Sequence, residues 1–169
     1  VDLDGHPSIE ALSKYVVNTQ RGTTLEKSGV KLKTIEHVLA ALVGLEIDNV
    51  LIEINAEEPP IMDGSSKFFV DALEKAGLKQ LNSLRKEYVI KNVITHKDEK
   101  SGSEITVIPS ENYQITAMVD YDTKVLGTQN ASLSKLSEFK DNFSNARTFS
   151  FLHEIEMLLE DNLIKGGDL

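Results

Sequence analysis

The sequence predicts an α+β fold built from two similar modules, residues 1–84 and 85–169. In the first half, local patterns run strand, strand, helix, strand, helix, and the second half places its strands before its helices. A composition of 40% hydrophobic and 27% charged residues is that of a globular protein with a packed core. The chain lacks an initial Met and stops after a glycine pair, so we expect the first module to be incomplete at its N-terminus and the second to be truncated.

The first module opens with two expected strands, residues 14–19 and 30–34, joined by a glycine-containing loop. A helix follows from Thr34, a natural N-cap residue, and ends near Gly44. Its apolar residues recur at i, i+3, i+4 and i+7, the spacing of one helix face: Ile35, Val38, Leu39 and Leu42.

The rest of the first module is an expected strand at 48–55, a turn-rich loop at 56–66 and a second helix that begins at Lys67. This helix is expected to end with Gly77 at its C′ position. Its expected buried stripe consists of Phe68, Phe69, Ala72, Leu73 and Ala76.

The second module opens with an expected hairpin, in which strands at 87–95 and 105–109 flank a polar turn. Alternating apolar residues predict a half-buried strand over 113–122, and a polar loop is expected at 123–134. Helical spacing then returns in two runs, Leu136, Phe139, Phe143 and Ala146, and Phe151, Ile155, Leu158 and Leu159.

Charge and composition narrow the range of functions. The formal net charge of −9 opposes a polyphosphate backbone, so no nucleic-acid partner is expected, although a few local cations can still bind a small anion. No apolar run reaches the length of a membrane span, so we expect no transmembrane segment. Cysteine is absent, which excludes disulfides and thiolate metal sites and fits the cytoplasmic location that we expect.

Glu36 and His37 place two neighbouring titratable groups at the start of the first apolar helix. On a wheel of about 100° per residue they project from the flank and the far side, in the sector that also holds Ala40, Ala41 and Gly44. Small residues in that sector allow a close approach, either by another domain or by a ligand.

Both groups lie in the first turn, where the helix dipole favours a carboxylate and disfavours an imidazolium. These are the forms that a general base and a metal ligand require. The alternative is a helix whose first turn carries two exposed polar residues, and from the pair alone this plainer interpretation is favoured.

The other histidines supply no complete metal site. His153 and Glu154 begin an H-E-x-x-H pattern, but Met157 stands where the second His is required. We interpret His6 as a loop residue and His96 as a solvated residue of a charged turn.

Two longer segments carry a family resemblance. Residues 34–70, TIEHVLAALVGLEIDNVLIEINAEEPPIMDGSSKFFV, and 145–167, NARTFSFLHEIEMLLEDNLIKGG, resemble the UDP-3-O-acyl-N-acetylglucosamine deacetylases, zinc-dependent enzymes at the committed step of lipid A biosynthesis. The similarity covers nearly the whole chain and is weakest at 88–140. It implies modules in which a sheet packs on helices, with the active site between the modules. It also implies Zn²⁺ as cofactor, a UDP-acyl-sugar as substrate and a monomeric full-length protein.

The resemblance assigns catalytic roles. Glu36 and His37 stand in the T-[IV]-E-H helix that gives the family its general base and a zinc ligand. Thr148 stands in the A-R-T-F segment, whose Thr hydroxyl stabilises the oxyanion. Zinc lowers the pKa of bound water to about 7, so Glu36 is expected to take a proton from that water as it attacks the acetamide.

The resemblance also implies contacts with the substrate. These are Phe149 against the sugar, Phe151 and Ile155 along a passage for the acyl chain that ends near Gly166 and Gly167, and Thr24 of the RGTTL loop at the border of the metal pocket. A dry passage suits an acyl chain because each buried CH₂ is worth about 0.8 kcal/mol. The same helix stripe also suits a core, and we assign most of it to core.

Two departures from the family pattern are present. Ser150 replaces the Gly usual in A-R-T-F-G-F. The family completes its metal site with an H-x-x-x-D motif and uses a later His as general acid, and we expect all three residues downstream of Leu169. The MDGS segment, residues 62–65, reads as a turn and helix cap, and we assign it no catalytic role.

The preferred hypothesis is a large part of this deacetylase that, by itself, neither hydrolyses the substrate nor holds zinc tightly, because a single His cannot form a tetrahedral site. Two alternatives keep the scaffold without the reaction. One is a non-catalytic binding module, which titration with RNA tests. The other is a degenerate paralogue.

Overall fold

The computed structural model describes residues 2–151 and 154–155. A short 3₁₀ turn, η1 (Ser13–Tyr15), leads into β1 (Val16–Asn18), β2 (Thr24–Lys27) and β3 (Val30–Leu32). These strands form an antiparallel sheet in the order β1-β2-β3. The prediction of two strands joined by a loop was incomplete, because the loop contains β2. Leu25 of β2 is buried and pairs with Val16 on one side and Leu32 on the other.

Helix α1 (Glu36–Gly44) confirms the first predicted helix. Its buried residues are Val38, Ala41, Leu42 and Gly44. The N-cap prediction was wrong, because Thr34 adopts a left-handed φ of 53° and its hydroxyl donates to Glu58 at 3.2 Å rather than accepting from the helix.

Helix α2 (Lys67–Ala76) confirms the second predicted helix, and Gly77 follows it at a φ of 84°. The predicted buried stripe was largely wrong. Val70 is the buried residue of this helix, whereas Phe68 is 48% exposed. Of the other predicted residues, Phe69 and Leu73 are half-buried, and Ala72 and Ala76 are exposed.

The strand predicted at 48–55 does not form. Among the described residues, 48–54 pair with no strand, although their backbone is not helical either. Valine and isoleucine favour a strand here, but a strand also needs a neighbour that accepts and donates its backbone hydrogen bonds.

The second half contains two antiparallel hairpins. One joins β4 (Ile94–Lys97) to β5 (Glu104–Val107), and the other joins β6 (Ile115–Asp120) to β7 (Thr128–Leu133). The first hairpin was predicted, but its first strand was expected at 87–95 and forms at 94–97, so His96 is an exposed strand residue rather than part of the turn. The polar loop predicted at 123–134 was wrong over the residues of β7. Strand β6 was predicted to be half-buried, yet all six of its residues are exposed.

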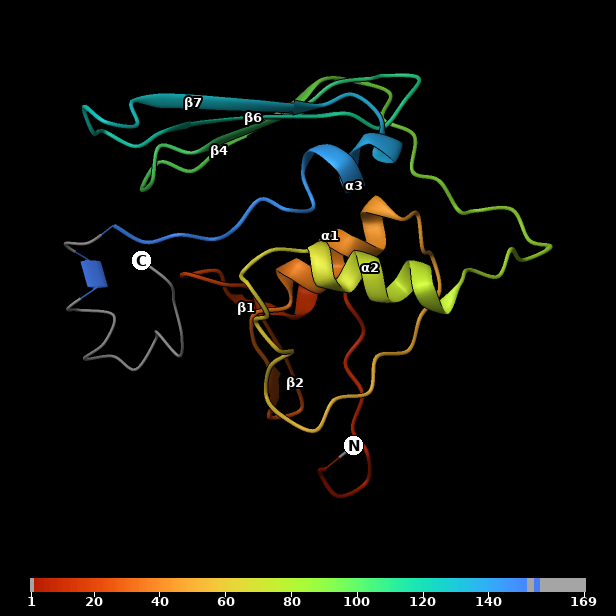
Figure 1. Cartoon of the computed structure of the whole chain (residues 1–169). Helices are drawn as coiled ribbons and strands as arrows, with labels where there is room; N and C mark the ends of the chain where they lie inside the picture. Colours follow the sequence, from red (N-terminus) through yellow and green to blue (C-terminus); the bar gives the residue numbers. More distant parts are fainter. Residues whose placement is uncertain (1, 152–153, 156–169) are drawn as a thin grey trace.

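A 3₁₀ turn, η2 (Leu136–Glu138), and α3 (Phe139–Asn142) follow β7, and in Figure 1 α3 lies between the hairpins and the pair of helices α1 and α2. Gly44 makes this packing close: a Cβ there would lie 2.1 Å from Cδ1 of Phe139. A side chain from the second half of the sequence therefore packs against Gly44. This is the kind of close approach that we predicted for the small residues of α1.

The described elements form a mixed α+β fold with small antiparallel sheets and three α-helices, which confirms the predicted class. They do not show the predicted pair of sheet-on-helix sandwiches. In the described part of the chain, no helix has the length and apolar character needed to cross a bilayer.

Candidate active site

The start of α1 is held by the turn before β2. Glu36 is half-buried, and its Oε2 accepts a hydrogen bond from the Thr23 N–H at 2.8 Å. The Ile35 N–H in turn donates to the Thr23 carbonyl at 3.4 Å. A Cβ on Gly22 would lie 3.3 Å from Glu36 Oε1, so glycine leaves the second carboxylate oxygen uncrowded. One oxygen of Glu36 is thus fixed by a backbone N–H, and the other lies beside Gly22.

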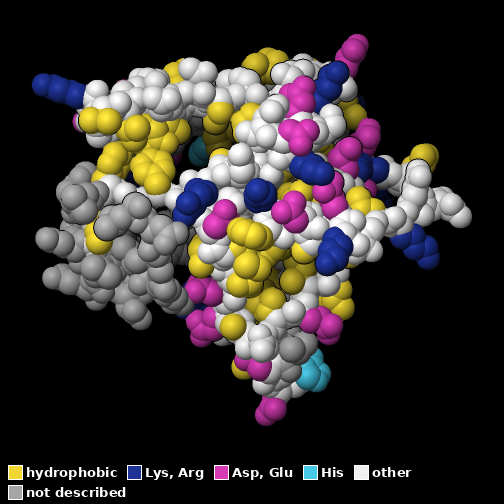
Figure 2. All heavy atoms as spheres, viewed as in Figure 1, with side chains coloured by type: hydrophobic (Ala, Val, Ile, Leu, Met, Phe, Trp, Pro, Cys, Tyr) yellow, Lys and Arg dark blue, Asp and Glu magenta, His cyan; other side chains and the backbone are white. Residues whose placement is uncertain are grey.

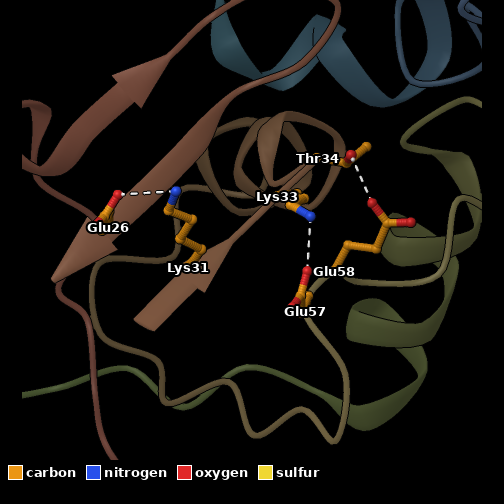
Figure 3. A network of polar contacts seen from close by, with 6 residues as sticks. All are labelled: Glu26, Lys31, Lys33, Thr34, Glu57 and Glu58. Atoms are coloured by element: carbon orange, nitrogen blue, oxygen red, sulfur yellow. Dashed lines mark hydrogen bonds and ion pairs between the residues drawn. The ribbon is translucent and has the colours of Figure 1, made fainter. Parts of the chain in front are cut away.

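The residues just before α1 are held from the other side by the 55–60 loop, as Figure 3 shows. The Lys33 ammonium lies 2.7 Å from Glu57 Oε2, and the Lys33 N–H donates to the Glu57 carbonyl at 2.8 Å. Glu57 raises the pKa of Lys33 through this side-chain hydrogen bond. Thr34 donates to Glu58, so both residues before Ile35 are anchored. Glu36 therefore sits on a backbone restrained by two loops.

His37 follows Glu36 on α1 and is half-buried. In the described part of the chain, no group of three or more His, Cys, Asp or Glu side chains is placed to hold a metal ion. Tetrahedral zinc sites use at least three protein ligands. The described residues therefore do not complete a zinc site around His37, and its role as a ligand stays a prediction.

Thr148 is exposed and lies outside any helix or strand. Its N–H donates to the Gly64 carbonyl at 2.7 Å, which attaches it to the MDGS segment. Asp63 of that segment accepts hydrogen bonds from the Ser65 hydroxyl at 2.7 Å and the Ser65 N–H at 3.1 Å. The Ser65 hydroxyl holds the pKa of Asp63 below its ordinary value of 3.8. The segment predicted to be only a turn and cap is the place where Thr148 docks.

Phe149 and Phe151 belong to one aromatic cluster with Tyr121. The two phenylalanine rings lie 5.5 Å apart between centroids, and Tyr121 lies 5.5 Å from Phe149 and 6.2 Å from Phe151, all edge-to-face. Such pairs contribute about 0.5–1.5 kcal/mol beyond their buried area. Phe149 remains 52% exposed, so the cluster does not enclose its side chain.

The turn beside Glu36 is also joined to the end of the described chain. Arg21 forms an ion pair with Glu154 at 2.5 Å, and the other oxygen of Glu154 accepts the Phe151 N–H at 3.0 Å. Ile155 is half-buried beside it. The predicted acyl-passage residues Gly166 and Gly167 lie outside the described residues.

The structure therefore brings the predicted residues together in two groups. One is Glu36 and His37 with the turn that leads to Thr24, a half-buried residue paired with Asn18. The other is Thr148, Phe149 and Phe151, attached to the MDGS segment and to Tyr121. In the described part of the chain, no hydrogen bond joins Thr148 to Glu36 or His37, so their convergence on one substrate stays a prediction.

Sequence reasoning missed the residues that hold these groups. Thr23 acts through its backbone N–H, which no side-chain pattern reveals. Gly22 acts by lacking a side chain. Gly64 was visible in the DG dipeptide, a common turn signal, but its contact with Thr148 spans a long stretch of sequence.

An apolar groove lies apart from Glu36, between α1, α2 and the 50–54 segment, which belongs to none of the described sheets. It has a volume of about 400 Å³, and its apolar lining includes Val38, Leu42, Val50, Ile52, Phe69 and Leu73. Figure 2 shows hydrophobic side chains gathered beside the helix pair. Glu36, His37 and Thr148 do not line this groove, so it is not the hollow in which their chemistry would occur.

Comparison with known proteins identifies the family. The family model described as LpxC, UDP-3-O-acyl N-acetylglycosamine deacetylase, matches residues 1–169. The bifunctional enzyme LpxC/FabZ of Bacteroides thetaiotaomicron is 45% identical over 100% of this chain and 37% of its own length. The UDP-3-O-acyl-N-acetylglucosamine deacetylases of Geotalea uraniireducens and Saccharophagus degradans are 41% and 39% identical over 100% of this chain, which covers 55% and 56% of their lengths.

The chain thus spans between 37% and 56% of the length of these curated relatives. The match nevertheless includes both the helix that begins at Glu36 and the segment that carries Thr148. The chain belongs to the LpxC family of UDP-3-O-acyl N-acetylglycosamine deacetylases.

Proposed function

We propose that this chain carries the general base, one metal ligand and the oxyanion donor of a deacetylase. The enzyme would hydrolyse the N-acetyl group of UDP-3-O-acyl-N-acetylglucosamine, the committed step of lipid A biosynthesis. The observation that supports this most is the Glu36 carboxylate, fixed at the start of α1 in a chain of this family. The predicted two-module arrangement, with the active site between residues 1–84 and 85–169, is part of the proposal.

In the proposed reaction, the oxygen of a water molecule attacks the acetamide carbonyl carbon while Glu36 takes the proton that water loses. The Thr23 N–H holds Oε2, so Oε1 is the oxygen we assign to the proton. The C–N bond then breaks and releases acetate. The departing amine needs a proton, and we assign this proton transfer to an acid other than Glu36 and Thr148.

The Thr148 hydroxyl would donate a hydrogen bond to the carbonyl oxygen as negative charge develops there. One such donor is worth about 10²- to 10³-fold in kcat. Phe149 would pack against the sugar, and Phe151 and Ile155 would line the acyl passage toward Gly167. The 52% exposure of Phe149 fits this role because a sugar ring needs accessible aromatic surface to pack against.

His37 would be one ligand of Zn²⁺, with the remaining ligands outside residues 1–169. The described residues do not complete the site, so we derive no step through the metal. The isolated chain is therefore expected to bind zinc weakly and to leave the substrate intact. Tight zinc binding at one ion per isolated chain would contradict this. The cytoplasmic location, the monomeric state and the absence of a nucleic-acid partner stay predictions.

The test compares Glu36→Gln with Glu99→Gln in the full-length protein. Glu99 is an exposed residue of the β4–β5 turn and serves as the matched control. We expect Glu36→Gln to lower kcat by about 10²- to 10⁴-fold with zinc content unchanged, because it removes a general base and no proposed ligand. Amine release gives kcat and elemental analysis gives zinc. Equal turnover in the two variants would remove Glu36 from the reaction.

A further inference from the structure

The 63–66 turn and the 144–148 segment come from opposite halves of the sequence and are hydrogen-bonded to each other. The Thr148 N–H donates to the Gly64 carbonyl at 2.7 Å, Arg147 Nε donates to the Asp63 carbonyl at 2.8 Å, and the Ser66 N–H donates to the Ser144 carbonyl at 3.0 Å. Each bond uses a backbone group of the 63–66 turn. The 144–148 segment is therefore attached along its length rather than at one point.

The turn is itself a rigid support. Asp63 accepts from both the N–H and the hydroxyl of Ser65, and the Gly64 N–H donates to the Ile61 carbonyl at 2.9 Å. Ser65 has no exposed surface and Ser66 is 6% exposed. Buried polar groups with their hydrogen bonds made are costly to displace. The turn is thus held more firmly than residues 145–148, which are exposed.

Gly64 also touches the Thr148 side chain. A Cβ built on Gly64 would lie 2.9 Å from Thr148 Cγ2, so the methyl group rests directly over the glycine. Threonine is branched at Cβ, and fixing its methyl group selects a single χ1 rotamer. That rotamer also sets the direction of the hydroxyl, which shares the same Cβ.

We propose that the 63–66 turn positions the hydroxyl of Thr148, with Gly64 as the residue that sets its rotamer. This inference rests on the proposed function, in which that hydroxyl meets the oxyanion. Thr148 stands on irregular, exposed backbone and gains no rigidity from a helix or strand. A misplacement of about 1 Å costs about 10²-fold in rate, so an oxyanion donor at such a place needs an external support.

The test is Gly64→Ala, with Gly77→Ala as the matched control. Both glycines have a left-handed φ, 79° and 84°, but a Cβ at Gly77 meets nothing within 4 Å. Both variants place a Cβ on a residue with positive φ, and only the Gly64 variant adds a contact with Thr148. In the full-length protein we expect Gly64→Ala to lower kcat about 10- to 100-fold with KM little changed. The reason is that the Thr148 hydroxyl is proposed to bind the oxyanion, whose charge develops only in the transition state. Gly77→Ala is expected to keep kcat within about twofold.

A rescue experiment separates positioning from a general loss of structure. Thr148→Ser keeps the hydroxyl and removes the Cγ2 methyl that meets the new Cβ. We expect Gly64→Ala to reduce kcat less in the Thr148→Ser background than in the wild type. An equal reduction in both backgrounds would overturn the inference.

Amide hydrogen exchange gives a readout that needs no substrate. The Thr148 N–H should exchange slowly in the wild type and in Gly77→Ala, and at least about 10-fold faster in Gly64→Ala. An unprotected Thr148 N–H in the wild type would overturn the inference even if Gly64→Ala failed to fold. If Thr148→Ala leaves kcat unchanged, the proposed role of Thr148 fails. If Thr148→Ala is damaging while the two glycine variants behave alike, only the positioning role fails.

Discussion

Replacing Gly44 by Ala tests how the second half of the chain packs on α1. The new Cβ would lie 2.1 Å from Cδ1, 2.5 Å from Cγ and 2.8 Å from Cε1 of Phe139. Carbon atoms in favourable contact are about 3.5–4.0 Å apart, so the ring or the helix must move by more than about 1 Å. The clash involves the near edge of a ring rather than the end of a flexible side chain, which leaves little room for local adjustment.

The expected loss follows from two opposing effects. Overpacking a close contact costs about 1–3 kcal/mol. Alanine favours a helix over glycine by up to about 1 kcal/mol, and less at the last residue of α1. We therefore expect Gly44→Ala to lower the free energy of unfolding by about 1–2 kcal/mol, which corresponds to a fall in Tm of about 2–8 °C for a chain of this size.

The assay is urea and thermal unfolding of the 169-residue chain, followed by far-UV circular dichroism. Val43→Ala is the control, because Val43 is the neighbouring residue and is 49% exposed. Phe139→Leu replaces the ring by a smaller aliphatic side chain, and in that background Gly44→Ala should cost less by at least about 1 kcal/mol. A Gly44→Ala chain more stable than the wild type would refute the reasoning, since helix propensity alone would then account for the result.

Two further predictions concern the first half of the chain. The pKa of Asp63 is lower in the folded state, so its contribution to stability is present above about pH 3.8 and is lost as pH falls through the folded pKa. The Asp63→Asn variant should therefore lose less stability than the wild type between pH 5 and pH 3. Equal losses in the urea midpoints of the two proteins would contradict this. Val70 is 1% exposed and Phe68 is 48% exposed, so Val70→Ala should cost about 2 kcal/mol and Phe68→Ala less than half as much in the same unfolding assay. The reverse order would restore the apolar stripe that the sequence predicted.

Much of the fold was predictable where a periodic pattern coincided with burial. The first turn of α1 and the spacing of Val38 and Leu42 predicted a helix that the structure contains. The sector of small residues predicted a close approach, and Phe139 occupies that place at Gly44. Strand β7 was missed because its residues are mostly polar, and it forms through pairing with β6 rather than through burial.

The part of the candidate site that consists of side chains could be predicted from the sequence. Glu36, His37 and Thr148 stand out through residue type and the family resemblance. The groups that hold them are the Thr23 N–H, the missing side chain of Gly22 and the Gly64 carbonyl. These are backbone features that the fold brings close to the three side chains. The contacts between them could therefore not be predicted from a single sequence.

The exposed apolar residues Val50, Leu51 and Ile52, beside the apolar groove, have a consequence for handling the protein. Exposed apolar surface attracts apolar surface on a neighbouring molecule, whereas a net charge of −9 keeps molecules apart in dilute buffer. At about 0.15 M salt, electrostatic repulsion reaches only about 8 Å. Light scattering by the purified chain should rise as sodium chloride is added, and storage in low-salt buffer should preserve clear solutions.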